Sequence, residues 1–147
     1  KNLVHEMIAE FRYVLIMSKN SPLASLKNIT YNDLKDYIEI SHADPYVPSL
    51  SFAEVKKEEL PDNSKRKILL FERASQFELL AQNPECFMWV SPVPDELKER
   101  YSLVECACDE NKRVYKDVLI HKKDYALSKT DKQFIEMLIE GKRNILK

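Results

Sequence analysis

The chain has 147 residues, 44% of them hydrophobic, and its 23 lysines and arginines nearly balance its 24 aspartates and glutamates. This length suits one domain, and because the charges interleave without a basic stripe, direct contact with nucleic acid is not expected. No apolar run approaches the ~20 residues that cross a membrane, and residues 1–10 do not resemble a signal peptide.

Glycine is nearly absent, with Gly141 as its single occurrence. Loops that hold phosphates need glycines so that backbone N–H groups can approach the ligand, and the sharp turn that carries a hydrolase nucleophile needs them as well. The dinucleotide fingerprint, the Walker loop and the nucleophile elbow are therefore excluded. The three cysteines, Cys86, Cys106 and Cys108, have no framework spacing and are interpreted as small apolar residues in a reducing cytoplasm.

Apolar runs alternate with short helical segments along the chain, a pattern typical of an α/β fold. Strands are predicted at 11–17, 37–41, 67–71, 86–90, 103–108 and 114–121. Helices are predicted to begin at Thr30, Ser51, Ser75, Asp95 and Ser128. All of these starts except Asp95 place a hydroxyl residue three positions before a carboxylate, which is typical of a helix N-terminus. The last helix is expected to carry an apolar stripe of Phe134, Ile135, Leu138 and Ile139.

Two pairs of polar residues lie where an α/β sheet could receive a ligand. Ser41 and His42 end a predicted strand, where open sheets place ligands, although the same residues could equally hydrogen-bond the loop backbone. Ser75 and Gln76 open a helix whose N–H groups could accept an anion, although capping alone also explains a serine there. The three histidines lie far apart in the sequence, so neither a metal site nor a cofactor is predicted.

Several segments, taken in chain order, resemble the effector-binding domain of LysR-type transcription regulators. Residues 13–24 (YVLIMSKNSPLA) resemble that family's strand and His-Pro-Leu-Ala element, with Ser21 in place of the histidine. Residues 33–41, 74–80 and 88–92 resemble later strands and helices of that family's second subdomain. Residues 118–139 resemble its returning strand and C-terminal helix. The chain departs from the family at residues 82–85, which replace a glycine-rich approach, and in lacking the first half of subdomain one and the winged helix-turn-helix.

The resemblance implies an α/β, periplasmic-binding-protein-like sensor domain, with one lobe mostly complete and only the C-terminal part of the other. Lobe two is expected at about 18–105, and residues 1–17 and 106–147 are expected to form the crossover and the remnant of lobe one. The ligand-facing positions that the resemblance implies are Ser41, His42, Ser75, Gln76, Val90 and Ser91. With most of the opposite wall missing, this chain alone is expected to bind effector weakly or not at all.

The resemblance thus predicts a non-catalytic, cytoplasmic domain that senses a small organic or amino acid for a bacterial regulator, which contacts DNA through a winged helix-turn-helix outside this chain. Exposed apolar stripes and strand edges favour association, so a homodimer is predicted, with possible exchange of the C-terminal segment. A solute-binding lobe of a receptor-like protein is the alternative and predicts export. A hydrolase is a further alternative, which turnover abolished by His42→Ala would support.

Overall fold

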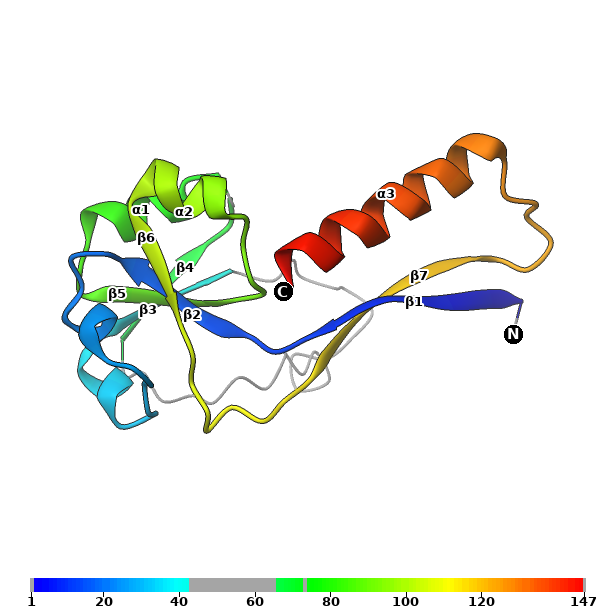
Figure 1. Ribbon diagram of the computed structural model, residues 1–147. Helices are drawn as coiled ribbons and strands as arrows, with labels where there is room; N and C mark the ends of the chain where they lie inside the picture. The colour runs from blue at the N-terminus through cyan, green and yellow to red at the C-terminus, as the bar shows by residue number, and fades with distance from the viewer. Residues whose placement is uncertain (1, 43–65, 73, 147) are drawn as a thin grey trace. The chain divides into compact units, whose positions relative to one another are not determined.

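The computed structural model describes residues 2–42, 66–72 and 74–146 (Figure 1). The helix predicted to begin at Ser51 lies outside these residues. In chain order the elements are β1 (Leu3–Phe11), β2 (Val14–Ser18), the 3-10 helices η1 (Pro22–Ser25) and η2 (Asp33–Asp36), β3 (Ile38–His42), β4 (Arg66–Leu70), α1 (Gln76–Gln82), β5 (Cys86–Val90), α2 (Asp95–Tyr101), β6 (Leu103–Cys106), β7 (Tyr115–Lys122) and α3 (Lys129–Ile145).

These elements form two compact units. Unit 1 comprises Lys1–Tyr13, Ser91–Pro94 and Asn111–Lys147, and unit 2 comprises Val14–Val90 and Asp95–Glu110. The chain therefore passes between the units more than once, and each unit is described by itself below.

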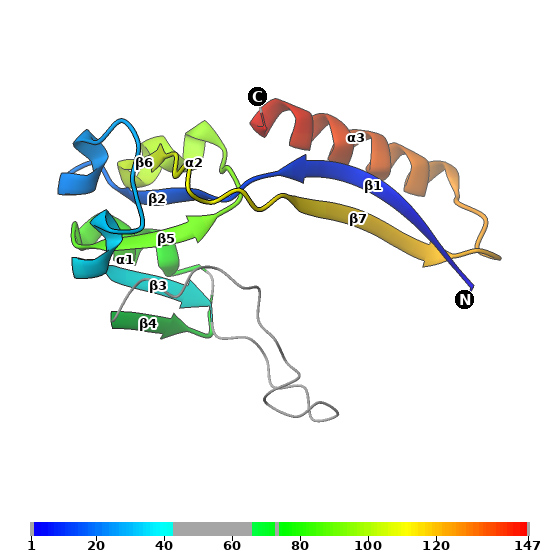
Figure 2. The ribbon, with the colours of Figure 1, turned by 90° about the horizontal axis from the view of Figure 1, so that it is seen from below.

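Unit 2 is built on a five-stranded sheet in the order β4-β3-β5-β2-β6 (Figure 2). Strands β4, β3 and β5 run parallel, whereas β2 runs antiparallel to both of its neighbours, β5 and β6. The inner strands are the most apolar: Leu15, Ile16 and Met17 of β2 are fully buried, and Phe87 of β5 is 1% exposed. A continuous apolar run is expected for a strand that is covered on both faces. The combination of a mixed sheet with helices confirms the predicted α/β class.

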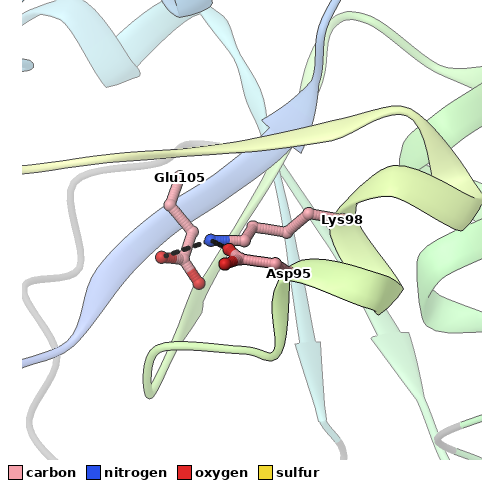
Figure 3. Close-up of polar contacts among 3 residues, drawn as sticks. All are labelled: Asp95, Lys98 and Glu105. Carbon is pink, nitrogen blue, oxygen red and sulfur yellow. Dashed lines mark hydrogen bonds and ion pairs between the residues drawn. The ribbon is translucent and has the colours of Figure 1, made fainter. Parts of the chain in front are cut away.

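Helices α1 and α2 lie on the same side of this sheet (Figure 1). Lys98 ties α2 to β6, because its ammonium lies 2.8 Å from Asp95 Oδ1 and 3.4 Å from Glu105 Oε2 (Figure 3). The hydrogen bond to Asp95, with the nearby charge of Glu105, raises the pKa of Lys98. After α2 the chain reverses at Ser102, whose φ of 52° is the left-handed conformation that commonly ends a helix. Serine occupies a position where glycine is usual, in agreement with the scarcity of glycine.

The strand predicted at 11–17 is in fact two strands. Phe11 ends β1, which pairs with β7, whereas Val14 begins β2, which pairs with β5 and β6. The run of apolar residues at 11–17 is interrupted only by Arg12, but the boundary between the units falls between Tyr13 and Val14. Periodicity does not reveal such a change of partners, because it does not specify which strands pair with each other.

Unit 1 consists mainly of the antiparallel β1–β7 pair with α3 alongside it (Figures 1 and 2). An aromatic cluster joins the two strands: Tyr13 and Tyr115 stack with ring centroids 4.0 Å apart, and Phe11 lies about 6 Å from both. Lys142 connects α3 to this cluster, since its ammonium lies 5.5 Å from the centre of the Phe11 ring and 2.6 Å from Asp117 Oδ2. Of the predicted apolar stripe, Ile135, Leu138 and Ile139 are partly buried, whereas Phe134 is 61% exposed.

The hydroxyl–carboxylate pairs predicted at helix starts have different outcomes. Ser128 and Asp131 form the reciprocal pair that caps α3: Asp131 N–H donates to Ser128 Oγ at 3.2 Å, and Ser128 N–H donates to Asp131 Oδ2 at 2.8 Å. Thr30 and Asp33 also exchange hydrogen bonds, but the segment that follows is only the 3-10 helix η2. A hydroxyl residue three positions before a carboxylate therefore indicates where a helical turn begins. It does not specify how long the following helix is.

Acid is expected to fray the start of α3. Hydrogen bonds from the side chain and backbone of Ser128, and from the Tyr125 hydroxyl, hold the pKa of Asp131 below its ordinary value of 3.8. A carboxyl whose pKa is lower in the folded state stabilises the fold above its unfolded-state pKa and loses that contribution as the pH falls through the folded-state pKa. Below pH 3.8, NMR Cα shifts of the first turn should therefore move toward coil values, while the middle of α3 changes less. Unchanged shifts in an otherwise folded protein contradict this expectation.

Among the residues that the structure describes, no helix combines the length and apolar character of a membrane span.

Candidate functional site

The candidate site is the edge of the unit 2 sheet where the parallel strands end. Strands β3 and β5 run parallel, with Ile38 opposite Cys86 and Glu39 opposite Phe87. Their carboxyl ends, His42 and Val90, therefore lie toward the same edge of the sheet. On the other side of β3, His42 lies opposite Leu70, the last residue of β4. Open α/β sheets place ligands at this edge, beyond the carboxyl ends of the strands.

Five of the six residues predicted to face a ligand lie in unit 2: Ser41, His42, Ser75, Gln76 and Val90. The sheet brings the ends of β3 and β5 to one edge, and therefore places His42 and Val90 there. Ser91 directly follows β5 in the chain and belongs to unit 1.

Ser41 is engaged by a buried carboxylate that sequence reasoning missed. Its hydroxyl donates to Glu39 Oε1 at 2.8 Å, and Lys67 of β4 lies 3.4 Å from Glu39 Oε2. The Glu39 side chain is only 4% exposed, and a carboxylate taken out of water needs such partners. A single glutamate among the isoleucines of β3 is the sequence signal of this cluster, but its lysine partner lies far along the chain. The Ser41 hydroxyl is thus used in a hydrogen bond to the buried Glu39 carboxylate near the end of β3.

The prediction that the Ser75 side chain caps α1 is wrong. Ser75 has φ −80° and ψ −8°, a helical conformation, and its hydroxyl makes no cap hydrogen bond, whereas a residue whose side chain caps a helix typically has an extended backbone. Instead Ser75 Oγ donates to Glu72 Oε2 at 2.8 Å, and the backbone N–H groups of Ala74 and Ser75 also donate to the Glu72 carboxylate. Glu72 therefore satisfies the donors before α1.

His42 and Glu72 lie close enough to interact electrostatically. Hydrogen bonds from Ser75 and Ala74 lower the pKa of Glu72, and the charge of His42 lowers it further. The end of β3 and the segment before α1 thus share one polar neighbourhood. The N–H groups of Ala74 and Ser75 are already hydrogen-bonded to the Glu72 carboxylate.

The geometry offers little for covalent or metal chemistry. In the part of the chain that the structure describes, no group of three or more His, Cys, Asp or Glu residues could hold a metal ion. Cys86, Cys106 and Cys108 are free thiols. Burial raises the pKa of Cys86 and Cys106, and Glu85 raises that of Cys86 further. A raised pKa keeps a thiol protonated and therefore weakly nucleophilic.

A shallow depression lies at the opposite edge of the sheet, beside the amino ends of β3 and β5. It is lined by Pro22, Asp36, Tyr37, Pro84 and Glu85. None of the six predicted site residues lines it, and it is open to solvent, so it adds nothing to the candidate site.

No protein-family model and no curated protein sequence matches the chain. Solved structures do match. The effector-binding domain of QuiR in complex with shikimate is 18% identical, with a TM-score of 0.63 over 99% of this chain and 68% of that one. The regulatory domain of MetR, a LysR family regulator from N. meningitidis, is 13% identical, with a TM-score of 0.63 over 99% and 67%. The CcmR regulatory domain from Synechocystis in complex with 2-PG is 15% identical, with a TM-score of 0.58 over 98% and 69%.

The match thus extends over almost all of this chain and about two thirds of the chains it resembles. At such low identities the likeness concerns the fold. The chain has the periplasmic-binding-protein-like α/β fold of the regulatory domains of LysR-family transcription regulators, as its sequence predicts.

Proposed function

We propose that this chain is part of the small-molecule sensing domain of a LysR-type transcription regulator. The observation that carries the proposal is the fold likeness to regulatory domains along 99% of the chain. The QuiR domain was solved with shikimate and the CcmR domain with 2-PG, which supports a small organic or amino acid as the class of effector. We place unit 2 as the more complete lobe and unit 1 as the remnant of the other.

The proposed ligand-facing residues are those at the carboxyl edge of the sheet and the start of α1. They are Ser41, His42, Ser75, Gln76, Val90 and Ser91. Of these, His42 and Gln76 present polar side chains, and nearby Glu72 adds an acceptor. This mixture favours a ligand with both donors and acceptors, such as an amino acid. Such a ligand shifts a regulator between two conformations only through a difference in affinity for the two.

The proposed domain is non-catalytic, cytoplasmic and homodimeric. The net charge of −1 gives this chain little attraction for phosphates. DNA binding is therefore not proposed for this chain and is assigned, from the fold likeness, to a winged helix-turn-helix of the regulator. The raised pKa values of the Cys86 and Cys106 thiols argue against a reactive cysteine at these two positions.

Ligand binding is best tested by NMR titration of the 147-residue chain with a panel of small organic acids and amino acids, because amide shifts also detect weak binding. We expect at least one compound to cause saturable shifts around His42 and Gln76. At a hundredfold excess over Kd, that compound should add about 2.7 kcal/mol to the free energy of unfolding.

Variants at the two ends of α1 provide the matched control. Gln76→Ala should weaken binding severalfold, whereas Gln82→Ala, at the far end of the same helix, should leave it unchanged. A panel without any saturable shift, or shifts that map away from this edge, would argue against the sensing function.

A further inference from the structure

The hydroxyl protons of both serines at the carboxyl edge of the unit 2 sheet and the start of α1 are already used within the chain. Ser41 Oγ donates to Glu39 Oε1 at 2.8 Å, and Ser75 Oγ donates to Glu72 Oε2, also at 2.8 Å. A serine hydroxyl has one proton to donate and two lone pairs that accept, whereas an ionised carboxylate only accepts. Toward any further partner, Ser41 and Ser75 therefore act only as hydrogen bond acceptors.

Both carboxylates have surroundings that suit the ionised form. The Lys67 ammonium lies 3.4 Å from Glu39 Oε2, and the backbone N–H groups of Ala74 and Ser75 donate to Glu72. The hydrogen bond from the Ser75 hydroxyl is the largest of the effects that lower the pKa of Glu72, so this carboxylate accepts at neutral pH. The fold thus fixes the direction of both serine hydrogen bonds.

We propose that the small molecule sensed at this edge is recognised through an ammonium group, with Ser41, Ser75 and Glu72 as the hydrogen bond acceptors. The inference rests on the proposed function, because it concerns the same site and narrows its ligands to amines and amino acids. An ammonium donates three hydrogen bonds and accepts none, and its bonds to a carboxylate are charge-assisted. A ligand carboxylate, in contrast, finds no donor on either serine hydroxyl.

The charges of unit 2 also favour a ligand with an amino group over a simple organic acid. Asp and Glu outnumber Lys and Arg among the residues of this unit, and a field of one sign concentrates ligands of the opposite sign. The basic side chains beside the acceptors each interact with one of the two carboxylates, Lys67 with Glu39 and His42 with Glu72. An anionic ligand would have to share these cations with the chain's own carboxylates.

Matched ligands that differ in the amino group test the inference by NMR titration of the whole chain. Leucine, 4-methylpentanoate and 3-methylbutylamine form one such trio, in which the second compound lacks the ammonium and the third lacks the carboxylate. Each amino acid of the panel is compared in a trio of this kind. In a trio that binds, the amine should keep its affinity within about tenfold of the amino acid, whereas the acid should lose more than that, because it leaves the acceptors of the site without a donor.

Variants identify the residues that read the ammonium. Glu72→Ala removes one acceptor and releases the Ser75 hydroxyl proton, so it should weaken amine binding at least tenfold and strengthen binding of the acid. Ser75→Ala removes an acceptor without releasing a donor, and should weaken amine binding severalfold without favouring the acid. Glu85→Ala is the matched control: it removes the same charge from the same unit, directly before the amino end of β5, and should change neither affinity. A dispersed amide spectrum shows that each variant is folded.

The possible failures separate the inference from the sensing function. Acids that bind at this edge as tightly as their amino counterparts overturn the inference, while the sensing function stands. Amine binding that neither Glu72→Ala nor Ser75→Ala weakens, or that Glu85→Ala weakens equally, overturns it as well, because the ammonium is then read elsewhere. A panel in which no trio binds overturns the inference together with the sensing function.

Discussion

Replacing Tyr115 by alanine should lower the free energy of local unfolding of unit 1 by about 3 kcal/mol. The Tyr115 ring stacks on Tyr13 at 4.0 Å and on Phe11 at 6.0 Å, and the Arg113 guanidinium lies 5.3 Å above it. Because the described part of unit 1 has no buried apolar side chain, this cluster provides much of its packing. Hydrogen exchange of the β1 and β7 amides should accelerate roughly a hundredfold, since each 1.4 kcal/mol is a factor of ten.

Two comparisons make the Tyr115 result specific. Tyr115→Phe keeps the ring and should leave exchange nearly unchanged. The fluorescence of Trp89, the one tryptophan in the sequence, reports on unit 2 and should also be unaffected. Wild-type exchange rates in Tyr115→Ala would show that the aromatic cluster contributes little to unit 1.

Replacing Lys67 by methionine should destabilise unit 2 by about 2 kcal/mol, toward the lower end for a broken buried ion pair because Lys67 is partly exposed. The substitution keeps the length of the side chain but removes the charge that faces the buried Glu39 carboxylate at 3.4 Å. The hydrogen bond from Ser41 remains but cannot replace a full counter-charge. Chemical denaturation followed by Trp89 fluorescence measures the loss.

A double variant identifies the cause. Combining Lys67→Met with Glu39→Gln should recover more than half of the lost stability, because an amide needs no counter-charge and still accepts from Ser41. Lys35→Met serves as the control: Lys35 lies in the same unit and donates a hydrogen bond to Asn32 Oδ1 at an exposed position, and surface interactions of a charged side chain typically contribute less than about 1 kcal/mol. Equal losses at Lys67 and Lys35, or no recovery in the double variant, would mean that Glu39 does not depend on Lys67.

Sequence patterns correctly predicted those elements that are specified by residues close together in the chain. The Ser128–Asp131 cap and the buried strand at 86–90 follow from residues a few positions apart. Ser75 shows where such reasoning fails: its pattern is equally typical of a cap, but Glu72 lies just upstream and takes both its hydroxyl and its N–H. The candidate site was predicted only as a set of strand ends and helix starts, so its acidic members, Glu39 and Glu72, were missed.

The sequence by itself determined the α/β class, the order of most elements and the exclusion of glycine-dependent phosphate chemistry, because these depend on composition and on periodicity within short windows. Tertiary structure alone decided that the run at 11–17 divides between two sheets, that Glu39 finds its lysine on a neighbouring strand, and that one face of the β1–β7 pair remains uncovered. Each of these depends on the pairing of strands distant in sequence, and a strand's own residues do not specify its partner.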